Sequence, residues 1–256
     1  MILRLSLQGM GPERGSFFFF KLKQKSLNIF MIVNNVANHE IFEFQSDEIL
    51  AQSVLTDILQ SDIHYTENLI SSTTKAGGSG YKKISDTEMV CYYNKELFDW
   101  IQSCLDEVTK KYFEKNTTLK ICDSWVTKTQ MGQISHKHKH VLSIFSGLYY
   151  LTDHNSSNTI FYFDDPVQAF FSPLLGEHVM PNKEIEFKSK PKIGKLLIWP
   201  SYIQHSVEVH REHKVRYTIA FNTFVDGKIS SWKSRVLHNN VNGIELQTPL
   251  KIPRTS

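Results

Sequence analysis

Three histidines alternate with lysines in the segment His136-Lys137-His138-Lys139-His140. The segment is typical of a β-strand, and side chains in a strand alternate between its faces, so the three imidazoles are expected on one face. Imidazole is the commonest protein ligand for transition metals, and such ligands with open coordination positions suit iron chemistry. The segment therefore predicts a metal site, to which either His136 with His138 or His138 with His140 could contribute.

A third ligand must return from a distant part of the chain, because two ligands on one strand occupy only one side of an ion. His205 follows Trp199-Pro200-Ser201 and lies at the start of another predicted strand. We predict that His205 completes the metal site with two of the clustered histidines.

An arginine and a threonine on the next predicted strand extend this site. Arg216 and Thr218 alternate onto one face, and the turn at residues 210–214 brings their strand back antiparallel to the one that carries His205. A buried arginine is costly without an anion, and a carboxylate is its natural bidentate partner. The combination predicts a small acid that chelates the metal at one end and contacts Arg216 and Thr218 at the other.

Short runs of β-forming residues follow one another through the second half of the chain, and turn residues separate many of them. This spacing is typical of a double-sheet jelly roll or a small barrel. The expected strands are Lys120–Thr127, Gly132–His140, Ser143–Leu151, Thr159–Phe163, Glu184–Phe187, Lys195–Trp199, His205–His210 and Val215–Phe224.

Two amphipathic helices are expected before this β-region, with Asp47 and Asn94 as their N-caps. The apolar face of the first helix is expected to contain Ile49, Leu50, Val54, Leu55, Ile58 and Leu59. The predicted organisation is a poorly ordered extension (1–30), a helical region that packs on the sheet (31–118), a β-core (119–234) and an irregular tail (235–256).

The composition narrows the function classes. The net charge of the 256 residues is only +3, and the lysines are dispersed, so nothing indicates a nucleic-acid partner. No run approaches the ~20 apolar residues of a membrane span, so no membrane partner is expected. The three cysteines, Cys91, Cys104 and Cys122, lack metal-binding spacing and predict buried thiols in a reducing, cytoplasmic setting. The oligomeric state is left open.

Five segments, in order, resemble the 2-oxoglutarate-Fe(II) oxygenases common in phages and marine bacteria. They are His138-Lys139-His140, Ser146–Leu151, Phe161–Pro166, Ile198–His205 and Arg216–Asn222. Each segment is weak evidence alone, whereas the ordered series, which spans roughly residues 123–224, is fairly specific.

This resemblance implies a mostly β (α+β) fold, a double-stranded β-helix with flanking N-terminal helices. It also implies Fe(II), 2-oxoglutarate as cosubstrate, dioxygen, and a hydroxylase reaction on a small molecule or protein side chain, with oxidative decarboxylation of 2-oxoglutarate to succinate.

The resemblance also assigns roles to residues. His138, His140 and His205 would hold iron, and their spacing to Ser146-Gly147 favours this set over one that includes His136. Arg216 and Thr218 would bind the far carboxylate of 2-oxoglutarate, and Tyr149 would line the same pocket. No catalytic residue beyond the metal ligands is expected.

The chain departs from the wider superfamily at the second ligand, where His stands in place of Asp or Glu. Three neutral imidazoles leave an Fe(II) site one negative charge short, which an acid such as Asp164 could supply. Two alternatives therefore stay open: a three-histidine, cupin-type dioxygenase that does not use 2-oxoglutarate, and a non-enzymatic jelly-roll binding module. Binding of 2-oxoglutarate through Arg216 separates the first from the main prediction, and bound iron with succinate formation separates the second.

Overall fold

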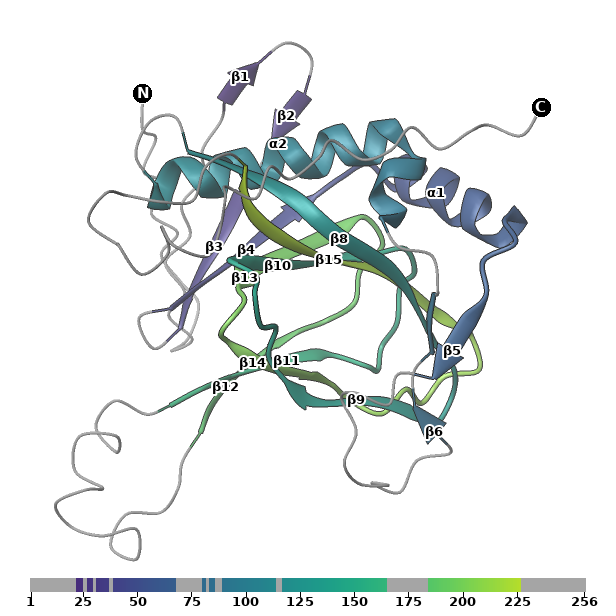
Figure 1. Cartoon of the computed structure of the whole chain (residues 1–256). Helices are drawn as coiled ribbons and strands as arrows, with labels where there is room; N and C mark the ends of the chain where they lie inside the picture. Colours follow the sequence, from purple (N-terminus) through teal and green to yellow (C-terminus); the bar gives the residue numbers. More distant parts are fainter. Residues whose placement is uncertain are drawn as a thin grey trace, which may run out of the picture.

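Two β-sheets face each other, and two helices cover the outer face of the larger sheet (Figure 1). The computed structural model describes residues 22–24, 27–29, 31–36, 39–67, 80–81, 83–85, 89–113, 117–164 and 184–226. The predicted mostly β fold with flanking helices is confirmed.

The strands of the β-core distribute between the two sheets as in a double-stranded β-helix. The larger sheet contains β8 (Thr118–Thr129), β10 (Phe145–Tyr150), β13 (Lys195–Pro200) and β15 (Arg216–Asp226). The smaller sheet contains β9 (Gln133–His138), β11 (Thr159–Phe163), β12 (Ile185–Ser189) and β14 (Gln204–Val207). Every strand predicted for this region is present, with ends that differ by a few residues.

The N-terminal region contributes strands as well as helices. In the larger sheet, β3 (Met31–Val36) and β4 (His39–Gln45) extend the edge beyond β13, and β7 (Lys83–Ser85) and β5 (Tyr65–Glu67) extend the edge beyond β8. In the smaller sheet, β6 (Gly80–Tyr81) runs parallel to β9. The prediction that residues 31–118 are helical is therefore incomplete, because this region also supplies strands to both sheets.

The two chain ends were predicted to be irregular. Within the predicted extension, the structure describes β1 (Leu22–Gln24) and β2 (Leu27–Ile29), which pair antiparallel. The remainder of residues 1–30 and the predicted tail, 235–256, lie outside the described residues. The predicted domain boundaries stay predictions.

Helices α1 (Glu48–Gln60) and α2 (Lys95–Tyr112) begin at the predicted caps, and a 3-10 turn, η1 (Val90–Tyr93), precedes α2. The carboxylate of Asp47 accepts a hydrogen bond from the N–H of Ile49, and the amide oxygen of Asn94 accepts one from the N–H of Leu97. The apolar face predicted for α1 is too wide, since Ile49 is 72% and Leu59 60% exposed. Within the described residues, no helix is long and apolar enough to cross a bilayer.

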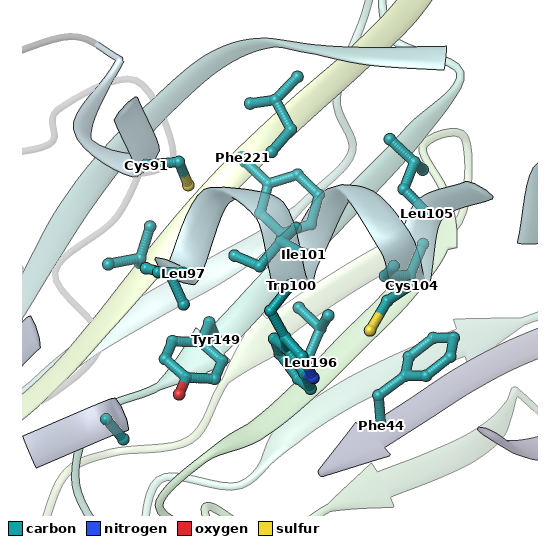
Figure 2. Packing of buried hydrophobic residues seen from close by; sticks show 14 of the residues in the cluster. Phe44, Cys91, Leu97, Trp100, Ile101, Cys104, Leu105, Tyr149, Leu196 and Phe221 are labelled. Carbon is teal, nitrogen blue, oxygen red and sulfur yellow. The ribbon is translucent and has the colours of Figure 1, made fainter. Parts of the chain in front are cut away.

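Strand β10 is buried on both faces, and its alternating side chains enter two different cores. Phe145 and Tyr149 point to the outer face of the larger sheet and pack against α2, and Figure 2 shows Tyr149 beside residues of α2. Leu148 and Tyr150 point the other way, into the core between the two sheets. The space between the sheets is therefore reached by the even-numbered residues of β10.

A side chain does not fit at Gly147 on β10, because a residue of the neighbouring strand occupies the space. It pairs with Phe221 of β15, and a Cβ added at Gly147 would overlap the ring of Phe221. We expect Gly147→Ala to lower the free energy of unfolding by about 1–3 kcal/mol, because the close-packed core must shift to admit the methyl group. Urea denaturation measures this loss. In a Phe221→Leu background, Gly147→Ala should lower the free energy of unfolding by less than it does in the unchanged protein. Equal stability of Gly147→Ala and the unchanged protein would contradict the packing argument.

The three cysteines are free thiols, as predicted. Cys91 and Cys104 are buried and Cys122 is half-buried. Burial raises the pKa of the Cys91 thiol to about 12 and raises the pKa of the Cys104 thiol well above its ordinary value. These two thiols are therefore packing residues in a neutral form.

Glu212 ties the turn before β15 to the loop before β11. Its carboxylate accepts hydrogen bonds from the N–H groups of Asn155 and Ser156, at 2.7 and 2.9 Å, from the hydroxyl of Ser156 and from the ring of His154. Partial burial raises the pKa of Glu212, but these hydrogen bonds outweigh it and lower the pKa to about 2.

Because the pKa of Glu212 is lower in the folded state, its contribution to stability is complete above pH ~4.5 and is lost as the pH falls toward 2. We expect the stability advantage of the unchanged protein over Glu212→Gln to shrink by roughly 1 kcal/mol between pH 6 and pH 3, because solvent screens a carboxylate that is 30% exposed. Urea titrations at both pH values measure it. The same substitution at the exposed Glu186 is the control, and a Glu212 difference that does not depend on pH would refute the assignment.

Candidate metal centre

The imidazoles of His138, His140 and His205 meet between the ends of two strands of the smaller sheet. His138 is the last residue of β9 and pairs with His205 of β14, and His140 follows two residues later. One ring nitrogen from each residue lies within 4.8 Å of the others. The ring centroids are 4.4 Å apart for His138 and His205, and 5.1 Å for His140 and His205. The structure thus brings together the three residues proposed from the sequence.

His136 does not belong to this group, and an irregularity in β9 explains why. In the pairing with β14, Ser135 lies opposite Val207 and His138 lies opposite His205, so β9 has one more residue between these pairs than β14. Such a β-bulge breaks the alternation of faces. The expectation that all three clustered imidazoles share one face is therefore wrong, and of the two possible near pairs the fold selects His138 with His140.

Each of the three rings is oriented by a hydrogen bond at Nδ1. The acceptors are the main-chain oxygen of His136 for His138 (2.6 Å), the side-chain oxygen of Asn222 for His140 (2.5 Å) and the main-chain oxygen of Ile203 for His205 (3.2 Å). A carbonyl oxygen only accepts, so Nδ1 carries a proton in each ring, and in the neutral ring the lone pair is then on Nε2. Neutral imidazoles held in this tautomer are suitable ligands for a divalent transition metal. The donor set therefore fits the metal that the sequence predicts.

Aromatic side chains surround the three histidines. The ring of Trp125, on β8, stacks on His140 with centroids 5.9 Å apart, and Trp199, on β13, meets His205 edge-on at 4.9 Å. His205 itself is only 6% exposed. Aromatic rings therefore cover part of His140 and His205.

The acid suggested from the sequence does not lie at this site. Asp164 follows β11 and is exposed. Among the described residues, the group of possible ligand atoms consists of three histidines and no carboxylate. The candidate site is therefore a three-imidazole site.

Arg216 is buried between the two sheets without a full set of hydrogen-bond partners. Its exposure is 1%, and its Nε and Nη2 atoms are buried and make no hydrogen bond within the described residues. The guanidinium lies over the ring of Tyr150, 5.3 Å from its centroid. Burial lowers the pKa of the Arg216 guanidinium. A buried guanidinium whose N–H groups lack acceptors can bind an anion.

Thr218 lies beside Arg216 on the inner face of β15. Its side chain is fully buried, and its hydroxyl contacts the hydroxyl of Thr127 on β8. Both residues proposed for the far carboxylate are therefore inside the fold, as the alternation along β15 predicts.

Tyr149 is not in this pocket, and the prediction for it is wrong. It packs against Trp100 of α2, and its hydroxyl bonds to Ser46 at 2.7 Å, on the opposite face of the larger sheet. Tyr150 occupies the inner position instead, with its hydroxyl 2.6 Å from that of Thr159. The error has a physical cause: both faces of β10 are covered, so hydrophobicity does not distinguish the inner face.

Residues 123–222 match the model of the family described as "Putative 2OG-Fe(II) oxygenase". No curated protein matches the chain. The non-heme alpha ketoglutarate dependent epimerase SnoN from nogalamycin biosynthesis is similar in structure, with a TM-score of 0.51 and 9% identity, over 72% of this chain and 78% of SnoN. The carbocyclase SnoK, from the same biosynthesis, gives 0.50 and 8%, over 84% of this chain and 90% of SnoK.

The fold and the three converging histidines define a double-stranded β-helix protein with a candidate mononuclear metal centre. Residues 123–222, which include these histidines and Arg216, match the model of the 2OG-Fe(II) oxygenase family, whose members use Fe(II) and 2-oxoglutarate. The predicted resemblance is confirmed at the level of this family, and the phage or marine bacterial type stays a prediction.

Proposed function

We propose that the chain is an Fe(II)- and 2-oxoglutarate-dependent dioxygenase that hydroxylates its substrate. In this proposal His138, His140 and His205 hold the iron, and Arg216 with Thr218 binds the far carboxylate of 2-oxoglutarate. Dioxygen and a small molecule or protein side chain are the other reactants. The free, buried thiols support a reducing, cytoplasmic setting.

The observation that carries this proposal is the pairing of two complementary features inside one fold. At one end, three Nδ1-anchored imidazoles converge, and at the other the open donors of Arg216 face the space between the sheets. Along β15, Arg216 and Asn222, which bonds to His140, are about 20 Å apart at the usual rise of a strand. A dicarboxylic oxo acid suits this pair of features, because one end can chelate a metal and the other can pair with a guanidinium.

The protein's contribution to the reaction is positioning and exclusion of water. Bound iron supplies the redox chemistry that activates dioxygen and decarboxylates the oxo acid. The three imidazoles fix the position of the ion, and Arg216 orients the cosubstrate through a charge-assisted contact. Trp125 and Trp199 shield the ion from bulk water.

Anaerobic titration of the full chain with Fe(II) and then 2-oxoglutarate tests this function without knowledge of the substrate. We expect a visible metal-to-ligand charge-transfer band that saturates with 2-oxoglutarate, and formation of succinate when air is admitted. An iron-loaded protein that gives no band at saturating 2-oxoglutarate, and shows no binding of it by calorimetry, would refute the proposal.

The three-imidazole group also favours a second candidate, a cupin-type dioxygenase in which the substrate itself chelates the iron. This candidate requires tight iron binding but no affinity for 2-oxoglutarate. The same titration therefore separates the two, since the first step succeeds for both and the second only for the leading proposal.

A further inference from the structure

We propose that Asn222 is a positioning residue for the metal centre, which sets the tautomer and the orientation of His140. The inference rests on the proposed function, because it assumes that His140 is a ligand. Asn222 ends one of the segments that carry the resemblance, but no role was predicted for it from the sequence, and the proposed role follows from its contacts.

The first step is the contact itself. Asn222 lies on the inner face of β15, two positions beyond Ala220, and its side-chain oxygen is 2.5 Å from Nδ1 of His140. His138 and His205 use main-chain oxygens for the same purpose, which no substitution can remove. The Nδ1 acceptor of His140 is thus a side chain, which a substitution can remove.

The second step is the support of the Asn222 amide. The hydroxyl of Ser146, on β10, lies 3.0 Å from the same oxygen and 2.8 Å from the hydroxyl of Ser201. Ser201 in turn donates to Ser143 at 2.8 Å, and its main-chain oxygen accepts the N–H of His140 at 3.1 Å. This serine network connects β10, β15 and the turn after β13, and it holds the amide with its oxygen toward the ring.

The third step is the consequence for a bound ion. If Nδ1 of His140 donates to Asn222, its Nε2 keeps the lone pair that a metal needs. Without this acceptor the ring can adopt the other tautomer or rotate. Metal binding must then restore the Nδ1–H tautomer and the ring orientation, which weakens the metal affinity. Loss of such an outer partner weakens metal binding about 10- to 100-fold in other sites.

The test compares Asn222→Leu, which keeps the volume but removes the acceptor, with Asn222→Asp, which keeps an acceptor oxygen. We expect Asn222→Leu to bind Co(II), used as an air-stable probe, about 10- to 100-fold more weakly than the unchanged chain. Asn222→Asp should bind it equally or more tightly. The matched control is Asn158→Leu, which removes the half-buried amide that donates to Glu208 and should leave Co(II) affinity unchanged.

A second measurement does not depend on metal. Long-range 15N–1H spectra of the metal-free full chain, labelled at histidine and assigned with a His140→Gln variant, report which ring nitrogen carries the proton. We expect the Nδ1–H form of His140 in the unchanged protein and in Asn222→Asp, and a mixture in Asn222→Leu. An Nε2–H form in the unchanged protein, or equal Co(II) affinity of Asn222→Leu, would overturn the inference. Failure of the unchanged chain to bind Co(II) would instead refute the metal centre, and the spectra would still decide the role of Asn222.

Discussion

Replacement of His205 by alanine is expected to abolish metal-dependent behaviour of the chain. His205 supplies the ligand from the second strand, so its loss leaves two imidazoles on one side of the ion. We expect Fe(II) or Co(II) affinity to fall more than about 100-fold, which exceeds the usual effect of removing an outer-shell partner. The measurement is the metal-induced rise in the free energy of unfolding, from urea denaturation. For the unchanged protein it should reach about 2.7 kcal/mol at a metal concentration of 100 Kd, and for the variant at the same concentration about 0.4 kcal/mol or less.

His136→Ala is the matched control for this experiment. It removes an imidazole from the same histidine cluster but leaves the main-chain oxygen that orients His138. We expect it to retain the metal affinity of the unchanged chain, because the bulge in β9 separates His136 from the converging group. Weak binding by His136→Ala with normal binding by His140→Ala would show that the near pair is His136 with His138 and would contradict the structure.

The strands of the β-core could be predicted from the sequence because each has a local signal. Runs of β-branched and aromatic residues end at turns such as the one at residues 155–158, and these short-range patterns do not depend on the rest of the fold. The short strands β5, β6 and β7 carry no comparable signal. They depend on tertiary pairing: β7 pairs with the edge of β8, β5 pairs with β7, and β6 pairs with the edge of β9.

The candidate site shows the same limit at the level of single residues. The alternation rule correctly placed Arg216 and Thr218 inside, because β15 is regular between them. The rule failed at His136, where a bulge interrupts the alternation of side chains along β9. It could not choose between Tyr149 and Tyr150, because α2 covers one face of β10 and the smaller sheet covers the other, so both faces are apolar. Asn222 did carry a signal, since an asparagine within a strand is unusual and it shares the face of Arg216.

Replacement of Arg216 by methionine is expected to have opposite effects on stability and on cosubstrate binding. Methionine keeps the length of the side chain but removes the buried charge, whose Nε and Nη2 make no hydrogen bond within the described residues. Because Tyr150 compensates this buried cation only in part, its removal should leave the stability of the ligand-free protein unchanged or increase it. A residue kept for structure alone would give the opposite result in urea denaturation.

Binding of 2-oxoglutarate to the Arg216→Met variant should fall about 100-fold, because a charge-assisted contact to a carboxylate contributes about 3 kcal/mol at most. The sharper measurement uses 2-oxopentanoate, which keeps the oxo acid but has a methyl group in place of the far carboxylate. The unchanged protein should discriminate strongly between the two acids, whereas Arg216→Met should bind both with similar weak affinity, since the only group that distinguishes them has lost its partner.

The control for this comparison of two proteins and two acids is Arg211→Met. It removes an exposed guanidinium from the turn before β15 and should keep the preference for 2-oxoglutarate over 2-oxopentanoate. Calorimetry with iron replaced by Co(II) gives all of these affinities without turnover. If Arg216→Met keeps the preference for 2-oxoglutarate, the far carboxylate binds elsewhere and the assignment of Arg216 fails. If the unchanged protein binds Co(II) but neither acid, the three imidazoles serve a reaction in which the substrate itself is the chelator.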